Sequence, residues 1–162
     1  MDKDFLTVIK EISGVLTKND LGLSIAESCT GGFISNAITN LPGSSRFFEM
    51  SVICYSTESK KSVLGISASL LKKHGTISEQ TSVAMAKAVR DLSGSDISLS
   101  VTGIAGPESI EDKDAGLIYM AVATRGLVES KGMKFSGDRE EIKRQASLAA
   151  LKFLNQVLRI WI

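Results

Sequence analysis

The chain has 162 residues, of which 43% are hydrophobic and 23% are charged, and its formal net charge is +1. This length fits one domain with a sizeable core rather than two, and a charge near zero provides no large field to recruit nucleic acid or an anionic membrane. With one histidine and two cysteines, the chain has too few of these residues for a zinc site unless Asp and Glu dominate it, and few members for a histidine-based triad. We therefore expect a single domain over residues 1–162 and no metal site.

Periodicity and turn residues predict that helices and strands alternate along the chain. Apolar residues at spacings of three and four indicate helices, and strict alternation indicates strands. The predicted helices cover 3–18, 33–40, a segment that begins at Ser56, 67–74, 78–93 and a last segment that begins near 136–139. The predicted strands cover 21–26, 47–55, 97–101, 116–124 and 128–135. This order predicts an α/β fold, a single-domain three-layer α/β/α sandwich with a mixed sheet.

The amino-terminal residues and the cysteines indicate the compartment. Met1-Asp2-Lys3-Asp4 is too charged for a signal peptide, and no apolar run reaches the length needed to span a membrane. The two cysteines, Cys29 and Cys54, are too few for a disulfide scaffold and suit a reducing environment. We expect a cytoplasmic protein that has no contact with a membrane.

The most informative stretch is Ala26-Glu27-Ser28-Cys29-Thr30-Gly31-Gly32, between the first predicted strand and the second predicted helix. Open α/β sheets bind their ligands at such strand-to-helix turns, and two adjacent glycines allow a close backbone approach. The backbone N–H groups of Thr30, Gly31 and Gly32 are candidate donors to a phosphate or to an oxyanion, while Ser28 is a candidate nucleophile. A plain helix cap would use the same residue types.

A second set of candidate donors lies in Leu41-Pro42-Gly43-Ser44-Ser45. Its small residues would let the backbone N–H groups of Gly43 and Ser44 reach an anion, although the same residues also form ordinary turns. Generic motifs do not decide between these alternatives. The stretch around Ser28 has no Walker lysine and lacks the Gly-x-Ser-x-Gly pattern of a nucleophile elbow.

Two lysines, Lys60 and Lys61, fall near the start of the helix that begins at Ser56. The positive end of a helix dipole disfavours lysine there. The dipole and partial burial both lower the pKa of a lysine, so that a neutral amine becomes available near pH 7. We expect Lys61 to be the solvent-exposed member of the pair and Lys60 to be the functional one.

Four segments, taken together, resemble the CinA C-terminal domain family, which includes free-standing nicotinamide mononucleotide deamidases. They are Ala26-Glu27-Ser28-Cys29-Thr30-Gly31-Gly32, Tyr55-Ser56-Thr57-Glu58-Ser59-Lys60, Thr102-Gly103-Ile104-Ala105-Gly106-Pro107 and Phe135-Ser136-Gly137-Asp138-Arg139. The resemblance implies an amidohydrolase domain that converts nicotinamide mononucleotide and water to nicotinic acid mononucleotide and ammonia. It also implies a homodimer or a higher homo-oligomer.

The resemblance assigns roles to five residues. The catalytic serine of the family falls on Ser28, the lysine on Lys60 and the assisting tyrosine on Tyr55, while Thr102 matches a site threonine and Arg139 an arginine that binds the ligand. An amide carbonyl needs a nucleophile, a proton acceptor and a stabiliser for the oxyanion. Ser28 and a neutral Lys60 supply the first two, with Tyr55 relaying or orienting the proton. This chemistry needs neither a metal nor an organic cofactor.

The chain departs from the family pattern at two places. The usual Tyr-Ser-Asn-Glu-Ala-Lys has Thr57 and Ser59 in place of its asparagine and alanine. The loop after Pro107, which in the family carries several glycines and a Lys-Pro, reads Glu108-Ser109-Ile110-Glu111-Asp112-Lys113-Asp114. We expect this second change to reshape the rim of the pocket.

Two other hypotheses remain open at this point. Cys29 is an alternative nucleophile, because a cysteine at a helix N-terminus is acidified. The chain can also be a ligand-binding or protein-interaction module that has lost catalysis and serves a competence or DNA-damage response. A Cys29→Ser variant that keeps activity would exclude the first hypothesis, and an assay for ammonia release would test the second.

Overall fold

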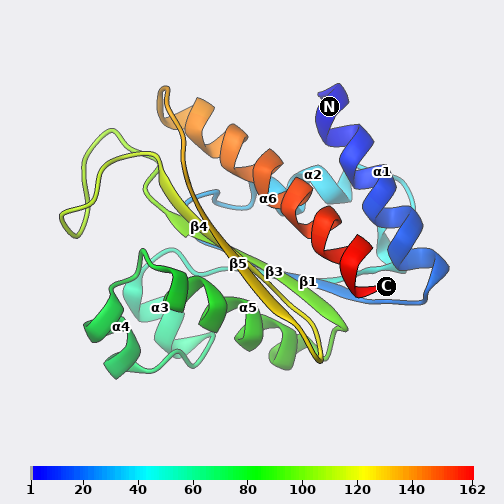
Figure 1. The fold of residues 1–162 in the computed structure, drawn as a ribbon, viewed down its shortest axis with the longest axis horizontal. Coiled ribbons are helices and arrows are strands. Elements are labelled where there is room, and N and C mark those ends of the chain that lie inside the picture. The colour runs from blue at the N-terminus through cyan, green and yellow to red at the C-terminus, as the bar shows by residue number, and fades with distance from the viewer. Residues whose placement is uncertain (1) are drawn as a thin grey trace.

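The computed structural model describes residues 2–162, and Figure 1 shows their arrangement. The helices are α1 (Lys3–Lys18), α2 (Phe33–Thr39), α3 (Thr57–Ser62), α4 (Ala68–His74), α5 (Glu79–Ser93) and α6 (Arg139–Trp161), with a 3₁₀ turn η1 at Ser44–Arg46. The strands are β1 (Leu23–Glu27), β2 (Phe48–Ile53), β3 (Ile97–Gly103), β4 (Leu117–Ala123) and β5 (Val128–Lys134). The predicted order and type of these elements are confirmed, with small shifts at their ends.

The five strands form one mixed sheet in the order β2-β1-β3-β4-β5. The first three of these run parallel, and β4 and β5 continue the sheet in antiparallel pairing. Helices α1, α2 and α6 cover one face, and α3, α4 and α5 cover the other (Figure 1). The predicted α/β/α sandwich with a mixed sheet is therefore confirmed.

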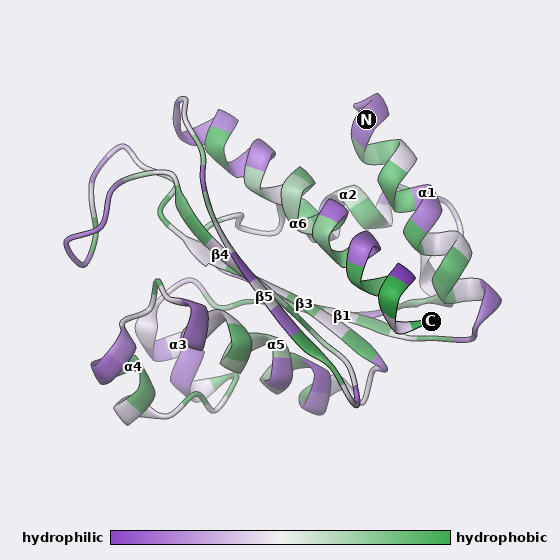
Figure 2. Cartoon of the chain, viewed as in Figure 1, coloured by the Kyte–Doolittle hydropathy of each residue, from purple (hydrophilic) through white to green (hydrophobic). Residues whose placement is uncertain are grey.

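Burial explains why β1 occupies the interior of the sheet. All five of its residues are buried, as expected for a parallel strand covered by helices on both faces. The larger core packs α1, α2 and α6 against the sheet, and a smaller one packs Leu71 of α4 with Met85 and Val89 of α5. Figure 2 shows these helices turning hydrophobic stripes toward the sheet. None of the described helices is both long and apolar enough to cross a membrane.

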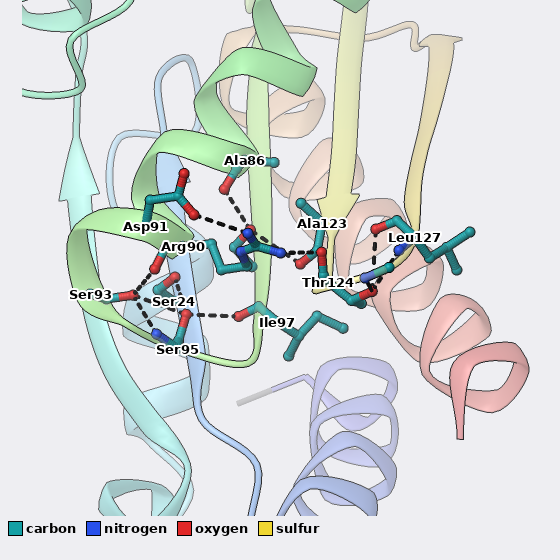
Figure 3. Close-up of polar contacts among 12 residues, drawn as sticks. Ser24, Ala86, Arg90, Asp91, Ser93, Ser95, Ile97, Ala123, Thr124 and Leu127 are labelled. Carbon is teal, nitrogen blue, oxygen red and sulfur yellow. Dashed lines mark hydrogen bonds and ion pairs between the residues drawn. The ribbon is translucent and has the colours of Figure 1, made fainter.

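Polar side chains attach α5 to the edge of the sheet where β1 and β3 begin (Figure 3). The Oγ atoms of Ser24 and Ser95 lie 2.7 Å apart, and the guanidinium of Arg90 donates to the carbonyl of Thr124. These contacts satisfy polar groups that would otherwise be buried without partners.

Candidate active site

A pocket of about 410 Å³ lies where β1 and β3 end, the place at which open α/β sheets bind ligands. Ser28 follows β1 directly, and Thr102 is the last residue but one of β3. Tyr55 and Lys60 come from the segment after β2, and Arg139 is the first residue of α6. All five line the pocket, so the residues that carry the predicted chemistry and ligand contact meet in one place.

A direct side-chain contact joins Lys60 and Ser28 in this pocket. Lys60 Nζ lies 2.9 Å from Ser28 Oγ, within hydrogen-bond distance. Ser28 is 6% exposed, and its backbone N–H donates to the carbonyl of Val101 at 3.0 Å. This bond anchors the serine to the end of β3, so the hydroxyl has a fixed position beside the amine.

Lys60 is buried without a carboxylate partner. It is 2% exposed, and among the described residues no acidic side chain forms an ion pair with its amine. Burial lowers the pKa of Lys60 below the usual 10.5, while weaker charge effects from Cys54, Cys29 and Glu111 act in the opposite direction. Desolvation disfavours the charged form of a lysine, so the amine is prepared to act as a base.

The three neighbours of Lys60 Nζ match the hydrogens and lone pair of a neutral amine. Two are carbonyl oxygens, of Cys54 at 2.8 Å and of Tyr55 at 3.5 Å, and these can only accept. The third is the hydroxyl of Ser28, which can donate. A neutral amine gives its two hydrogens to the carbonyls and turns its lone pair to Ser28. The geometry therefore suits removal of the hydroxyl proton.

The structure changes the reason for the lowered pKa. Helix α3 has only six residues, so Lys60 and Lys61 lie in its last turn rather than at its positive end. Ser56 caps this helix with Ser59 in a reciprocal capping box. The predicted effect of the helix dipole on Lys60 is thus wrong, and desolvation by burial is the main cause of its lowered pKa. Lys61 is partly exposed and pairs with Glu58 at 2.6 Å.

Glu27 already occupies the N-terminus of α2. Its buried carboxylate accepts from the backbone N–H groups of Gly32, Ile34 and Ser35 at 2.9 to 3.2 Å, and from the hydroxyls of Thr30 and Ser35 at 2.6 and 2.5 Å. Gly32 caps the helix with a φ of 93°, which favours glycine. The Gly32 N–H predicted to bind an anion therefore binds an internal carboxylate.

The other predicted donors differ from one another. The Gly31 N–H donates to the carbonyl of Ser28 at 3.0 Å, whereas the N–H of the fully buried Thr30 has no hydrogen-bond partner within residues 2–162. Gly43 and Ser44 precede β2, whose first residue Phe48 pairs with the first residue of β1. They lie at the edge where these parallel strands begin, and the structure does not bring them to the Ser28 pocket.

Arg139 and Tyr55 form the rim. The guanidinium of Arg139 donates to the hydroxyl of Tyr55 at 2.6 Å and to the carbonyl of Gly106 at 2.5 Å. Tyr55 is 58% exposed, and its hydroxyl contacts Arg139 rather than Ser28 or Lys60. Thr102 donates its hydroxyl to the carbonyl of Thr76 at 2.8 Å. Its oxygen can therefore accept from a ligand, while its proton is already used.

Cys29 lines the pocket but has an unreactive environment. Burial raises the pKa of its thiol to about 12, and a backbone hydrogen bond at Cys29 and the weaker effect of Lys60 offset only part of this rise. A thiolate is therefore scarce at neutral pH. His74 ends α4 and does not line the pocket. Both observations argue against Cys29 as the nucleophile.

Residues beyond the predicted set also line the pocket, among them Thr76 and Ile77, which lie between α4 and α5 and face the end of β3. They were not predicted as site residues, although they belong to the segment His74-Gly75-Thr76-Ile77-Ser78-Glu79, which also agrees with the family pattern. Across residues 2–162, no three His, Cys, Asp or Glu side chains gather closely enough to hold a metal ion.

Comparison with known proteins identifies the family. Residues 6–158 match the CinA C-terminal domain. The chain belongs to this family. It is 49% identical over 146 residues to a putative competence-damage inducible protein of Caldicellulosiruptor bescii, an alignment that covers 90% of this chain and 36% of that relative. The chain thus spans little more than a third of the length of such relatives.

Solved CinA-family structures share the whole fold. The competence damage-inducible protein A of Klebsiella pneumoniae superposes with a TM-score of 0.95 at 34% identity, covering 98% of this chain and 99% of that one. The competence/damage inducible protein CihA of Agrobacterium tumefaciens gives 0.93 at 31% identity, with 98% of each chain covered. The fold and family are therefore shown over nearly the full chain.

Proposed function

We propose that this CinA-family protein is an amidase that hydrolyses the carboxamide of nicotinamide mononucleotide to nicotinic acid mononucleotide and ammonia. The observation that carries the proposal is the 2.9 Å contact between Lys60 Nζ and Ser28 Oγ. A buried amine with a lowered pKa, beside a serine hydroxyl in an open pocket, is the arrangement that nucleophilic catalysis on an amide requires.

In the proposed reaction, Ser28 Oγ attacks the carboxamide carbon while Lys60 accepts the hydroxyl proton. The tetrahedral intermediate then collapses, the C–N bond breaks, and the leaving nitrogen takes the proton from Lys60 and departs as ammonia. Water, activated by the again neutral Lys60, adds to the acyl-serine and releases the carboxylic acid and Ser28. The backbone N–H of Cys29 binds no other residue within 2–162, and we assign it to the oxyanion.

Arg139 fits the phosphate end of the substrate. Its guanidinium lies on the pocket rim, and no carboxylate within the described residues pairs with it. A planar, permanently charged fork suits a phosphate well. Glu27 fills the N-terminus of α2 with negative charge, so the phosphate is better bound on the α6 side of the pocket.

The direct test is incubation of the purified protein with nicotinamide mononucleotide, followed by assay of ammonia and of nicotinic acid mononucleotide in equal amounts. A Ser28→Ala variant, prepared in parallel, controls for contaminating amidase. Production of both compounds by the wild-type chain alone supports the proposal. Tight binding of the nucleotide without turnover would instead favour a ligand-binding module.

A further inference from the structure

The loop between β3 and β4 contains an unusual two-residue turn. Ile110 and Lys113 exchange backbone hydrogen bonds of 3.1 and 3.0 Å, which leaves Glu111 and Asp112 at the tip. Both have positive φ, 54° and 57°, as a type I′ turn requires. Asn and Gly are the residues that such turns favour. A glutamate held in this conformation points to a contact that its side chain makes.

The Glu111 side chain reaches across to the segment between α4 and α5. Its carboxylate accepts from the backbone N–H of Thr76 at 2.8 Å, from the Thr76 hydroxyl at 2.6 Å and from the N–H of Ile77 at 3.4 Å. Lys113 donates to the carbonyl of Ile77 at 2.6 Å. The turn therefore binds the N–H groups of Thr76 and Ile77 through Glu111, and the carbonyl of Ile77 through Lys113.

A further hydrogen bond links the segment that Glu111 contacts to the end of the sheet where Ser28 lies. The carbonyl of Thr76 accepts from the hydroxyl of Thr102 near the end of β3, and both threonines line the same pocket as Ser28. Ile110, next to Glu111, lines the pocket from the loop side and is 50% exposed. Glu111 itself does not line the pocket. It is placed to act on a ligand only through these neighbours.

The charge state of Glu111 suits an anchor. Burial acts to raise the pKa of its carboxyl, but hydrogen bonds from Thr76 and Ile77 and the charge of Lys113 outweigh this, and the pKa lies below its usual 4.5. The carboxylate is thus charged at neutral pH and its hydrogen bonds are of the stronger, charge-assisted kind.

We propose that Glu111 is a positioning residue that holds the Thr76–Ile77 wall and the Ile110 side chain in the shape that binds the mononucleotide. It acts mainly on the affinity for substrate, because its charge is the weakest of the effects on the pKa of Lys60. This inference rests on the proposed function. It assigns a role to the loop in which this chain departs most from the family pattern.

Three variants test the role of Glu111. Glu111→Asn keeps a residue that a type I′ turn favours but is too short to reach Thr76. Glu111→Gln keeps the reach and one accepting oxygen. Asp114→Asn is the matched control, because Asp114 is a carboxylate of the same loop that pairs with Lys134 of β5 at 2.8 Å and does not line the pocket.

Steady-state kinetics with nicotinamide mononucleotide give the first readout. We expect Glu111→Asn to raise KM by roughly tenfold, a typical size for loss of one anchoring contact, with kcat little changed. Glu111→Gln should recover part of the affinity, and Asp114→Asn should match the wild type. An unchanged KM in Glu111→Asn, or a fall in kcat alone, would overturn the inference.

Hydrogen exchange at the Thr76 amide gives a second readout that needs no substrate. We expect faster exchange in Glu111→Asn than in Asp114→Asn, because only the first loses the acceptor of this N–H. Equal exchange in the two variants would show that Glu111 does not anchor the segment. If the wild-type chain leaves nicotinamide mononucleotide intact, the proposed function is overturned, and with it the role of Glu111 in affinity. If the wild-type chain is active and Glu111→Asn has the same KM as the wild type, only the inference about Glu111 is overturned.

Discussion

Lys60 Nζ lies 2.9 Å from Ser28 Oγ although 32 residues separate them in the chain. The two side chains come from segments that follow neighbouring parallel strands, β1 and β2, and meet because parallel strands end at the same edge of a sheet. The two atoms of this contact are the targets of the first prediction.

Removal of either atom should abolish most turnover. We expect Ser28→Ala to lower kcat by at least about 10³-fold, and Lys60→Met by roughly 10²–10⁴-fold, the usual contribution of a general base. Methionine is preferred to alanine because Lys60 is one of the largest fully buried side chains, and its stem fills core space. Lys61→Met is the control, since Lys61 only pairs with Glu58 at the surface. Wild-type kcat in Lys60→Met would refute the assignment of the base.

The pH dependence should follow Lys60. Because the neutral amine is the base, kcat/KM should rise with pH through the pKa of Lys60, which burial places below 10.5. Between that pKa and 10.5 the unfolded chain holds a proton that the folded chain has lost, so stability rises with pH by at most about 1.4 kcal/mol per unit. Urea unfolding at several pH values should reveal this slope in wild type and its absence in Lys60→Met.

Cys29 should be dispensable for catalysis. With a thiol pKa of about 12 and 6% exposure, we expect little alkylation by iodoacetamide at pH 7.5 in the folded protein. Cys29→Ser should keep most of the activity, because the smaller hydroxyl fits the site and the backbone N–H remains. Rapid alkylation with parallel loss of turnover would restore Cys29 as the nucleophile.

Arg139 and Tyr55 should affect binding more than chemistry. We expect Arg139→Ala to raise KM for nicotinamide mononucleotide strongly and to change little for nicotinamide riboside, which has no phosphate. Tyr55→Phe removes the hydroxyl that contacts Arg139 and should raise KM with a smaller effect. A large fall in kcat in Tyr55→Phe would instead support a role in proton transfer. If Arg139→Ala lowered kcat/KM by the same factor for both substrates, Arg139 would not bind the phosphate.

Glu27 should be essential for stability. Glu27→Ala leaves three N–H groups at the start of α2 without their acceptor, of which the one of Ile34 is buried and the other two are partly buried. Because a buried unpaired group costs about 1–3 kcal/mol, we expect a loss of at least about 1 kcal/mol in unfolding free energy by urea titration. Glu58→Ala removes an exposed carboxylate and should change stability by under about 0.5 kcal/mol. Similar values for the two variants would contradict this role.

Local chemistry made much of the fold and site predictable. The helix start at Ser56, the start of the last helix near 136–139 and the strand-to-helix turn at Ser28 are signals within a few residues, and the structure has them where the sequence indicates. The family motifs likewise predicted which side chains meet in the pocket.

The features that depend on pairing between distant parts of the chain could not be predicted from the sequence. Sequence could not tell that Glu27 would use the N–H groups of the Gly-rich turn, because its carboxylate might equally have faced solvent. Gly43 and Ser44 carry suitable chemistry, but the parallel register of β1 and β2 puts them at the wrong edge of the sheet. The pKa of Lys60 depends on burial across two strands rather than on its place in α3.

The Ser28 N–H bond to Val101 spans 73 positions of the chain, and it joins two central strands that pair in parallel. Contacts of such high sequence separation form late, after loop closure has been overcome. Recovery of enzymatic activity after dilution from denaturant should therefore follow the slow assembly of the sheet and lag behind the return of helical circular dichroism. The recovered activity would then measure the fraction of chains with the native strand pairing, rather than the fraction of residues in helices.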